Sequence, residues 1–82
     1  MYTVYVLYSS GYDKIYIGMT SDLTERLRSH NELGKKGWTI SFRPWTCIYT
    51  ELFGKKPQAL AREKQLKTAK GRAFIRTLLK KT

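Results

Sequence analysis

Tyr5 and Tyr16 carry phenol hydroxyls in two short apolar runs, Val4-Tyr5-Val6 and Tyr16-Ile17-Gly18. Both runs are rich in strand-forming residues and the segment between them favours a turn, so the pattern predicts a β-hairpin with the two hydroxyls on neighbouring strands. A phenol has an ordinary pKa of about 10, so it acts as a base near neutral pH only beside a cation or a metal-bound water. The alternative is that both rings fill a core or cover a sheet face, because six tyrosines in the chain make chance placement easy.

Arg26 and His30 are four residues apart in a segment that is expected to be helical, so their side chains would share one face. The planar guanidinium of Arg26 stays charged at any relevant pH and could brace a phosphate, whereas an Asp22–Arg26 ion pair within the helix is an equally good interpretation. His30 could carry a proton or donate to a phosphate, or it could simply fill space at a helix end. It is the only histidine and the chain has one cysteine, so we do not expect a zinc site.

Glu63 is the acidic residue that fits its surroundings least well. Its spacing to Ala59, Leu60 and Leu66 places it on or beside the apolar stripe of a predicted helix that should face the sheet. A carboxylate near a basic surface costs desolvation energy unless it is paired, and a hard divalent cation is one partner that would offset this cost. A surface ion pair with Lys67, four residues later, is the alternative, and the pattern alone favours it.

Apolar periodicity and turn residues predict three strands and three helices. We expect strands at residues 2–8, 14–18 and 46–53, helices at residues 21–31, from Pro57 onward and after a break near Gly71, and a basic loop over residues 34–44. Ser21 or Asp22 would cap the first helix. The order strand, strand, helix, strand, helix, helix predicts an α+β domain, in which helices cover a small antiparallel sheet.

The length and composition predict a single domain over residues 1–82. The chain has 82 residues, of which 41% are hydrophobic, and this supplies one small core. Cys47 lies in the third expected strand, where we expect it to be a small buried hydrophobe. No apolar stretch approaches the roughly 20 residues of a membrane-spanning helix, and the first residues lack the features of a signal peptide. We therefore expect a cytoplasmic protein without membrane contact.

The charge of the chain is strongly basic. Sixteen Lys and Arg against six Asp and Glu give a formal net charge of +10 and a pI near 10.0. This excess predicts a polyanionic partner, with nucleic acid first, because each basic side chain that meets a phosphate releases counterions. A nucleic-acid-binding module without turnover is therefore one hypothesis, whereas a protein-interaction domain is disfavoured. The phosphate contacts of this module would be Lys35, Lys36, Lys55, Lys56, Lys70 and Arg72. Trp38, Phe42 or Trp45 would stack on bases. Packing within the loop explains these three aromatic residues equally well.

Taken together, these residues resemble the GIY-YIG endonuclease family, most closely its small stand-alone bacterial members. The second family motif is intact as Tyr16-Ile17-Gly18, whereas the first keeps only its central tyrosine, with Val4 and Val6 around it. The remaining family positions are matched by Arg26, His30 and Glu63. The likeness covers residues 2–67, and an asparagine that some members place after the glutamate has no counterpart in residues 68–72. The resemblance implies a three-stranded antiparallel β-sheet flanked by helices, in the order β-β-α-β-α-α.

The resemblance also implies a divalent-metal-dependent endonuclease that hydrolyses DNA to leave a 5′-phosphate and a 3′-hydroxyl. Glu63 would bind one Mg²⁺ or Mn²⁺, and Tyr16 or Tyr5 would position or deprotonate the attacking water. Arg26 would stabilise charge on the phosphoryl oxygens, with assistance from His30. Gly18 would let the chain pass close to the site, although it could also simply end a strand. The expected substrates are branched, flapped or damaged DNA in repair or recombination, or RNA, with specificity conferred by a protein partner.

Overall fold

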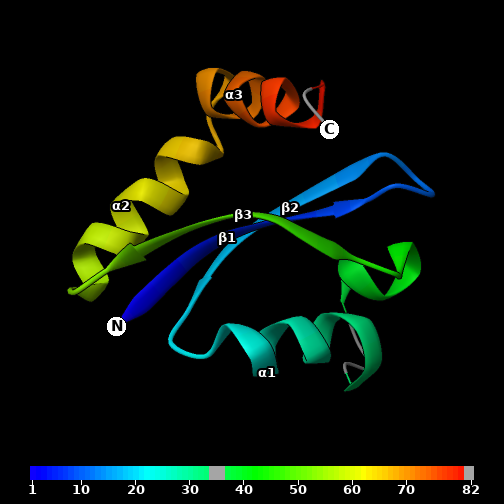
Figure 1. The fold of residues 1–82 in the computed structure, drawn as a ribbon, viewed down its shortest axis with the longest axis horizontal. Coiled ribbons are helices and arrows are strands. Elements are labelled where there is room, and N and C mark those ends of the chain that lie inside the picture. Colours follow the sequence, from blue (N-terminus) through cyan, green and yellow to red (C-terminus); the bar gives the residue numbers. More distant parts are fainter. Residues whose placement is uncertain (34–36, 81–82) are drawn as a thin grey trace.

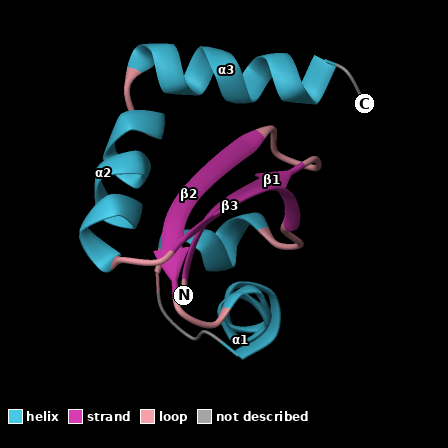
Figure 2. Ribbon diagram, turned by 60° about the vertical axis from the view of Figure 1, so that its left-hand side comes forward, coloured by secondary structure: helices cyan, strands magenta, loops and turns pink. Residues whose placement is uncertain are grey.

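One three-stranded antiparallel sheet, covered by helices on both faces, forms the protein in a computed structural model that describes residues 1–33 and 37–80. The strands are β1 (Tyr2–Ser9), β2 (Lys14–Thr20) and β3 (Thr46–Phe53), and the helices are α1 (Leu23–Arg28), α2 (Lys56–Leu66) and α3 (Ala69–Lys80), with a π-helical turn at Ser29–Leu33 and a 3₁₀ helix at Trp38–Phe42. Helix α1 lies on one face of the sheet, and α2 and α3 lie on the other (Figures 1 and 2). The α+β class and the order of strands and helices are therefore confirmed.

Strand β1 is the central strand, in the sheet order β2-β1-β3, and it is buried on both faces. Tyr5 and Leu7 pack on the side of α1, whereas Val4 and Val6 pack on the side of α2 and α3. Val, Leu and Tyr suit a strand that has no solvent-facing side. The side chains of β1 therefore alternate between two clusters: one that contains Tyr5 and Trp45 on the side of α1, and an aliphatic core on the side of α2 and α3.

The β1–β2 hairpin sets the relation between the two tyrosines. Tyr5 pairs with Gly18, and Leu7 pairs with Tyr16, so the two phenols are diagonal neighbours on one face of the sheet. Strand β3 has the bounds that the sequence predicts and runs antiparallel to β1 on its other side. The predicted placement of both hydroxyls on neighbouring strands is confirmed.

Helix α1 is shorter than the expected helix over residues 21–31. It begins at Leu23, because Asp22 stays extended and its carboxylate accepts a 3.1 Å hydrogen bond from the amide of Glu25. Regular α-helical structure ends at Arg28, and the π-helical turn at Ser29–Leu33 follows directly. Asp22 is thus confirmed as one of the two predicted caps, and the predicted helix was too long at both ends.

The segment after α1 also differs from the expected loop over residues 34–44. A 3₁₀ helix fills Trp38–Phe42, and it begins after Gly37, which has a φ of 113° that favours glycine. The Ser9 hydroxyl donates a 2.6 Å hydrogen bond to the carbonyl of Phe42, and this bond fixes the 3₁₀ helix to the end of β1. Lys35 and Lys36 lie outside the described residues.

The break between the last two helices comes before Gly71, not at it. The Thr68 carbonyl accepts from the amide of Arg72 and its hydroxyl accepts from the amide of Gly71, so α3 is already forming at these residues. A Cβ on Gly71 would overlap the backbone of Gln65 and Leu66. The glycine therefore permits the close corner between α2 and α3, and the predicted break near Gly71 is confirmed at residues 67–68.

Two further expectations concern burial and membranes. Cys47 is only half-buried in β3, where it packs against the cluster around Tyr5 and Leu7. Burial raises the pKa of the Cys47 thiol.

Of the helices within residues 1–33 and 37–80, none has the length and apolar character that crossing a bilayer requires.

Candidate active site

Tyr5 and His30 form the buried polar centre of the site. The Tyr5 hydroxyl lies 3.1 Å from Nε2 of His30, and Nδ1 of the same ring lies 3.2 Å from the hydroxyl of Thr39. All three side chains are buried. The two ring nitrogens therefore each have a hydroxyl partner, and either neutral tautomer of His30 satisfies both contacts.

Tyr16 lies over this centre from the neighbouring strand. Its ring centroid is 4.6 Å from that of His30 and 6.2 Å from that of Tyr5. Tyr5 is 1% exposed, whereas Tyr16 is only partly buried. Of the two phenols, Tyr16 is therefore the one placed to meet a substrate or a water, and Tyr5 is placed to hold His30.

The 3₁₀ helix and the segment after it hold His30 in place through contacts that the sequence did not predict. Trp45 donates from its indole Nε1 to the carbonyl of Thr39 at 2.8 Å. Asn31 clamps the backbone of Trp45, donating to its carbonyl and accepting from its amide. Arg43 donates to the carbonyl of His30. The Arg43 bond reaches a carbonyl of the π-helical turn, whereas the other contacts involve backbone groups of Thr39 and Trp45.

Gly18 leaves the space that the phenol of Tyr5 occupies. A Cβ built on Gly18 would overlap the hydroxyl oxygen and the ζ carbon of Tyr5, and it would also crowd Tyr16. Any other residue would force the Tyr5 ring to move, because buried rings have little room to shift. The prediction that Gly18 allows a close approach at the site is confirmed.

Burial sets the protonation of this centre. Desolvation raises the pKa of Tyr5 well above its ordinary value, Tyr16 and Glu63 raise it further, and only the cation of Arg26 acts in the other direction. Burial also lowers the pKa of His30, helped by the positive charges of Arg26 and Arg43. At neutral pH the centre therefore holds a protonated Tyr5 and a neutral His30 that can accept a proton.

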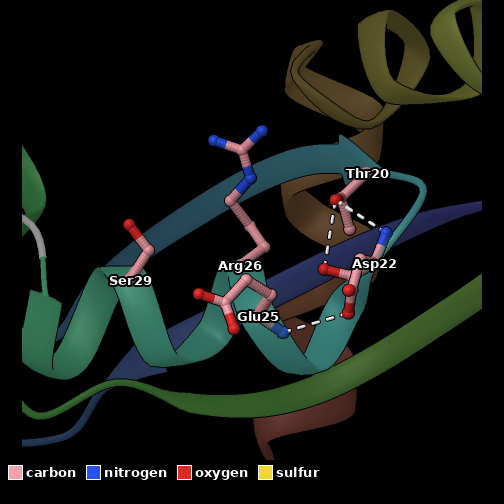
Figure 3. A pocket seen from close by; sticks show the side chains of 5 residues that line it. All are labelled: Thr20, Asp22, Glu25, Arg26 and Ser29. Carbon is pink, nitrogen blue, oxygen red and sulfur yellow. Dashed lines mark hydrogen bonds between the residues drawn. The ribbon is translucent and has the colours of Figure 1, made fainter.

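Arg26 projects from α1 into an open pocket. The pocket has a volume of about 310 Å³ and is lined by Thr20, Asp22, Glu25, Arg26 and Ser29. Figure 3 shows the guanidinium group pointing away from the carboxylates of Asp22 and Glu25. Asp22 instead caps α1, and within residues 1–33 and 37–80 no acidic side chain pairs with Arg26. The Asp22–Arg26 pair is therefore wrong, and Arg26 is available to an anion.

Glu63 lies in α2, between the buried Ala59 and Leu66, while Leu60 is exposed and does not belong to the apolar stripe. The side chain of Glu63 is only 20% exposed, and its Oε2 forms a 3.0 Å ion pair with Nζ of Lys67. The Glu63–Lys67 ion pair that the sequence pattern favoured is therefore present in the structure. The negative charge of Glu63 also contributes to raising the pKa of Tyr5.

The Glu63 carboxylate could bind a divalent ion only if substrate and water supplied the remaining ligands. Within residues 1–33 and 37–80, no three His, Cys, Asp or Glu side chains converge as a metal cage would require. Mg²⁺ commonly binds one or two carboxylates and completes its shell with waters and substrate phosphates. A single, mostly buried carboxylate suits that mode, and Glu63 is the residue that would hold the ion.

The basic side chains that the sequence proposed for phosphate contacts do not form one cluster. Lys55 and Lys56 lie at the start of α2, whereas Lys70 and Arg72 lie near the start of α3, and all four are exposed. The two pairs are separated by the length of α2, about 16 Å. Their role on nucleic acid stays a prediction.

The three aromatic side chains that were considered for base stacking differ in exposure. Trp45 is 3% exposed and belongs to the core beneath Tyr16, so it cannot stack on a base. Trp38 is 50% exposed, and Phe42 lies partly buried beside it. The stacking role is therefore wrong for Trp45, and it remains open to Trp38 and Phe42.

Comparison with known proteins shows the family of this chain. The chain matches the GIY-YIG catalytic domain over residues 1–76, a span that includes all five candidate site residues. A UPF0213 protein of Staphylococcus haemolyticus is 32% identical over 56 residues, which cover 68% of this chain and 68% of the relative. A UPF0213 protein of Bacillus velezensis is 35% identical over 66 residues, covering 77% of this chain and 67% of the relative. The chain therefore belongs to the GIY-YIG family, and its catalytic domain is that of an endonuclease.

Proposed function

We propose that this protein is a divalent-metal-dependent endonuclease that hydrolyses DNA phosphodiester bonds. The observation that carries the proposal is the grouping of Tyr16, His30 and Tyr5 in mutual contact. Arg26 lines a separate pocket and has no acidic partner among the described residues, and its positive charge acts on both Tyr5 and His30. A fixed cation beside a buried proton acceptor is what hydrolysis of a phosphodiester needs, because charge builds on the phosphoryl oxygens while a water loses its proton.

Each side chain has a distinct task in this reaction. Arg26 binds the scissile phosphate and stabilises the charge that develops on its oxygens. Tyr16 orients the attacking water from the open side of the cluster. The proton that the water loses passes to the Tyr16 hydroxyl, which gives its own proton to the Tyr5 hydroxyl, and Tyr5 in turn gives its proton to Nε2 of the neutral His30. Tyr5 and Thr39 keep that ring in place through their hydrogen bonds to its two nitrogens.

Glu63 would hold the divalent ion, Mg²⁺ or Mn²⁺, on the side of the site formed by α2. When bound, such an ion supplies Lewis-acid polarisation of the phosphate and stabilises the leaving oxygen. The Lys67 ammonium must then leave the carboxylate or share it. Because Lys67 is half exposed, this exchange costs little.

The proposal is tested with labelled single-stranded, duplex, flapped and branched DNA, incubated with protein and Mg²⁺, Mn²⁺ or EDTA. We expect cleavage with either metal and none with EDTA. Glu63→Gln should slow cleavage by at least about 100-fold, because it removes the anionic ligand without changing the shape of the side chain. Glu32→Gln is the matched control, since Glu32 also pairs with a basic residue four positions away but lies exposed on the π-helical turn.

A binding module without turnover is the second candidate, and the net charge of +10 favours it. It predicts that the folded wild-type protein binds members of the DNA panel and cuts none of them with either metal. Equal cleavage by wild type and Glu63→Gln would contradict the metal role of Glu63 and leave the endonuclease assignment in place.

A further inference from the structure

Three aromatic rings gather at the turn of the β1–β2 hairpin, apart from the residues proposed to carry out hydrolysis. Tyr12 in the hairpin turn makes an edge contact with Phe42, with 5.4 Å between the ring centroids. The ring centroid of Trp38 lies 4.7 Å from that of Phe42. Tyr12 and Trp38 retain 55% and 50% of their exposure. Rings that serve only to pack a loop are mostly buried, as Trp45 is, so this arrangement is a surface and not a small core.

Hydrogen bonds hold the segments that carry this surface, formed by Tyr12, Trp38 and Phe42. The Ser9 hydroxyl ties the 3₁₀ helix to the hairpin through the carbonyl of Phe42. On the far side of the turn, Asp13 accepts from the hydroxyl of Tyr8 at 2.9 Å and from Nη1 of Arg76 at 2.6 Å. Because these segments are already held in place, little conformational entropy is lost when a flat ligand stacks on the rings they carry.

The charge around the rings suits a ligand that carries phosphates. The Lys14 ammonium lies 5.5 Å from the ring centroid of Phe42. The nearest acidic residue of the turn, Asp13, is neutralised by Arg76, and the chain as a whole carries +10. Aromatic faces beside a lysine are the combination with which proteins bind unpaired bases while the cation meets the backbone.

The buried ring of Trp45 connects this surface to the candidate active site. Trp38 lies 5.7 Å from Trp45 between ring centroids, and Trp45 lies 6.4 Å from Tyr16. One buried ring therefore separates the exposed indole from the tyrosine that would face the attacking water. A strand stacked on Trp38 would lie next to the point of cleavage.

We propose that Tyr12, Trp38 and Phe42, with Lys14, form a stacking platform for the unpaired bases of single-stranded DNA leading into the active site. This rests on the proposed endonuclease function and narrows its substrate to DNA with a single-stranded segment beside the cleaved bond. Duplex bases are already stacked on one another and present no free faces, so the platform selects against a fully paired end.

The test measures binding by fluorescence anisotropy in EDTA, so that no cleavage occurs. The probes are a labelled single-stranded oligothymidylate of about 12 nucleotides, an abasic strand of the same length, a blunt duplex and an oligouridylate. Variants are Trp38→Ala, Tyr12→Ala and the conservative Trp38→Phe, with Leu52→Ala as control, because Leu52 is an exposed apolar residue on β3. Circular dichroism confirms that each variant is folded.

We expect Trp38→Ala to weaken binding of oligothymidylate by roughly 5- to 150-fold, and Trp38→Phe to restore part of the loss. Tyr12→Ala should act in the same direction without disturbing Trp45, because the described ring contact of Tyr12 is with Phe42 alone. Binding of the abasic strand and the duplex should change by less than about twofold in both variants, since neither offers a free base face. Leu52→Ala should leave all four affinities unchanged.

The platform is overturned if Trp38→Ala and Tyr12→Ala leave the affinity for oligothymidylate unchanged, or weaken binding of the abasic strand equally. Tighter binding of oligouridylate, with the same loss in the variants, would overturn the assignment to DNA. Since the assay contains EDTA, absence of cleavage in a separate nuclease assay would contradict the proposed hydrolysis without affecting this result.

Discussion

The hydroxyl of Tyr5 on β1 and Nε2 of His30 on the π-helical turn lie 3.1 Å apart and are both buried. This hydrogen bond joins the central strand to the layer of α1 at the point where Tyr16 contacts the same imidazole. The position of the His30 ring therefore depends on a partner 25 residues earlier in the chain.

Tyr5→Phe should destabilise the protein by about 1–3 kcal/mol, because it leaves a buried nitrogen of His30 without its partner. The free energy of unfolding in urea measures this change. Tyr12→Phe is the control, since Tyr12 is exposed and removal of its hydroxyl should alter stability by less than about 0.5 kcal/mol. Equal losses in the two variants would contradict the structural role of the Tyr5–His30 bond.

Gly18→Ala should reduce both stability and cleavage, because the new Cβ would overlap the phenol of Tyr5. Overpacking of this kind costs about 1–3 kcal/mol, and displacement of Tyr5 also moves His30. Gly11→Ala is the matched control in the hairpin turn, where an added Cβ has no neighbour within 4 Å. Urea unfolding and a cleavage assay on the same preparations separate the two effects, and a Gly18→Ala protein as stable and active as Gly11→Ala would contradict the close approach.

The stability of the protein should fall as the pH is lowered past the ordinary pKa of histidine, 6.5. Burial, aided by Arg26 and Arg43, lowers the pKa of His30 in the folded state, so the unfolded chain binds the proton first. The stabilisation is fully present above 6.5 and is lost as the pH falls through the folded-state pKa. Urea unfolding of wild type and His30→Gln between about pH 7.5 and about pH 5.5 should show a smaller decrease in the variant. An identical decrease in both proteins would contradict a buried neutral His30.

Lys67→Ala should lower the Mg²⁺ concentration needed for half-maximal cleavage, because the Lys67 ammonium occupies Oε2 of Glu63 in the free protein. A partly exposed pair of this kind contributes about 0–1 kcal/mol, so the expected shift is at most about fivefold. A Mg²⁺ titration of the initial cleavage rate measures it. Lys64→Ala, in the same helix and exposed, should leave the titration unchanged. A requirement for more Mg²⁺ in Lys67→Ala than in wild type would contradict competition between ion and ammonium.

The local pattern of the sequence was sufficient for the elements that carry the site. The β-hairpin, the bounds of β3 and the cap at Asp22 follow from strand propensity, turn residues and capping chemistry, which act between neighbours in the chain. The nearness of Tyr5 to Tyr16 follows from the hairpin. These are properties that depend on a few adjacent residues.

The supporting contacts could not be predicted, because they depend on how distant segments pack. Nothing in the local sequence indicates that Thr39 would meet a histidine nine residues earlier, or that Asn31 would clamp the backbone of Trp45. Gly71 has the composition signal of a helix end, and only the approach of α2 reveals its use inside α3. The burial of Trp45 also depends on distant segments, so the sequence could not show that this residue packs in the core and does not stack on bases.

The most direct measurement is the single-turnover rate of DNA cleavage in Mg²⁺ for wild type, Arg26→Ala and Arg28→Ala. Both arginines lie in α1 and carry the same charge, but only Arg26 enters the pocket, whereas Arg28 pairs with Glu32. We expect Arg26→Ala to lose roughly 100- to 1,000-fold in rate and Arg28→Ala to remain within a few-fold of wild type. Equal rates for Arg26→Ala and wild type would contradict the active site described for this protein.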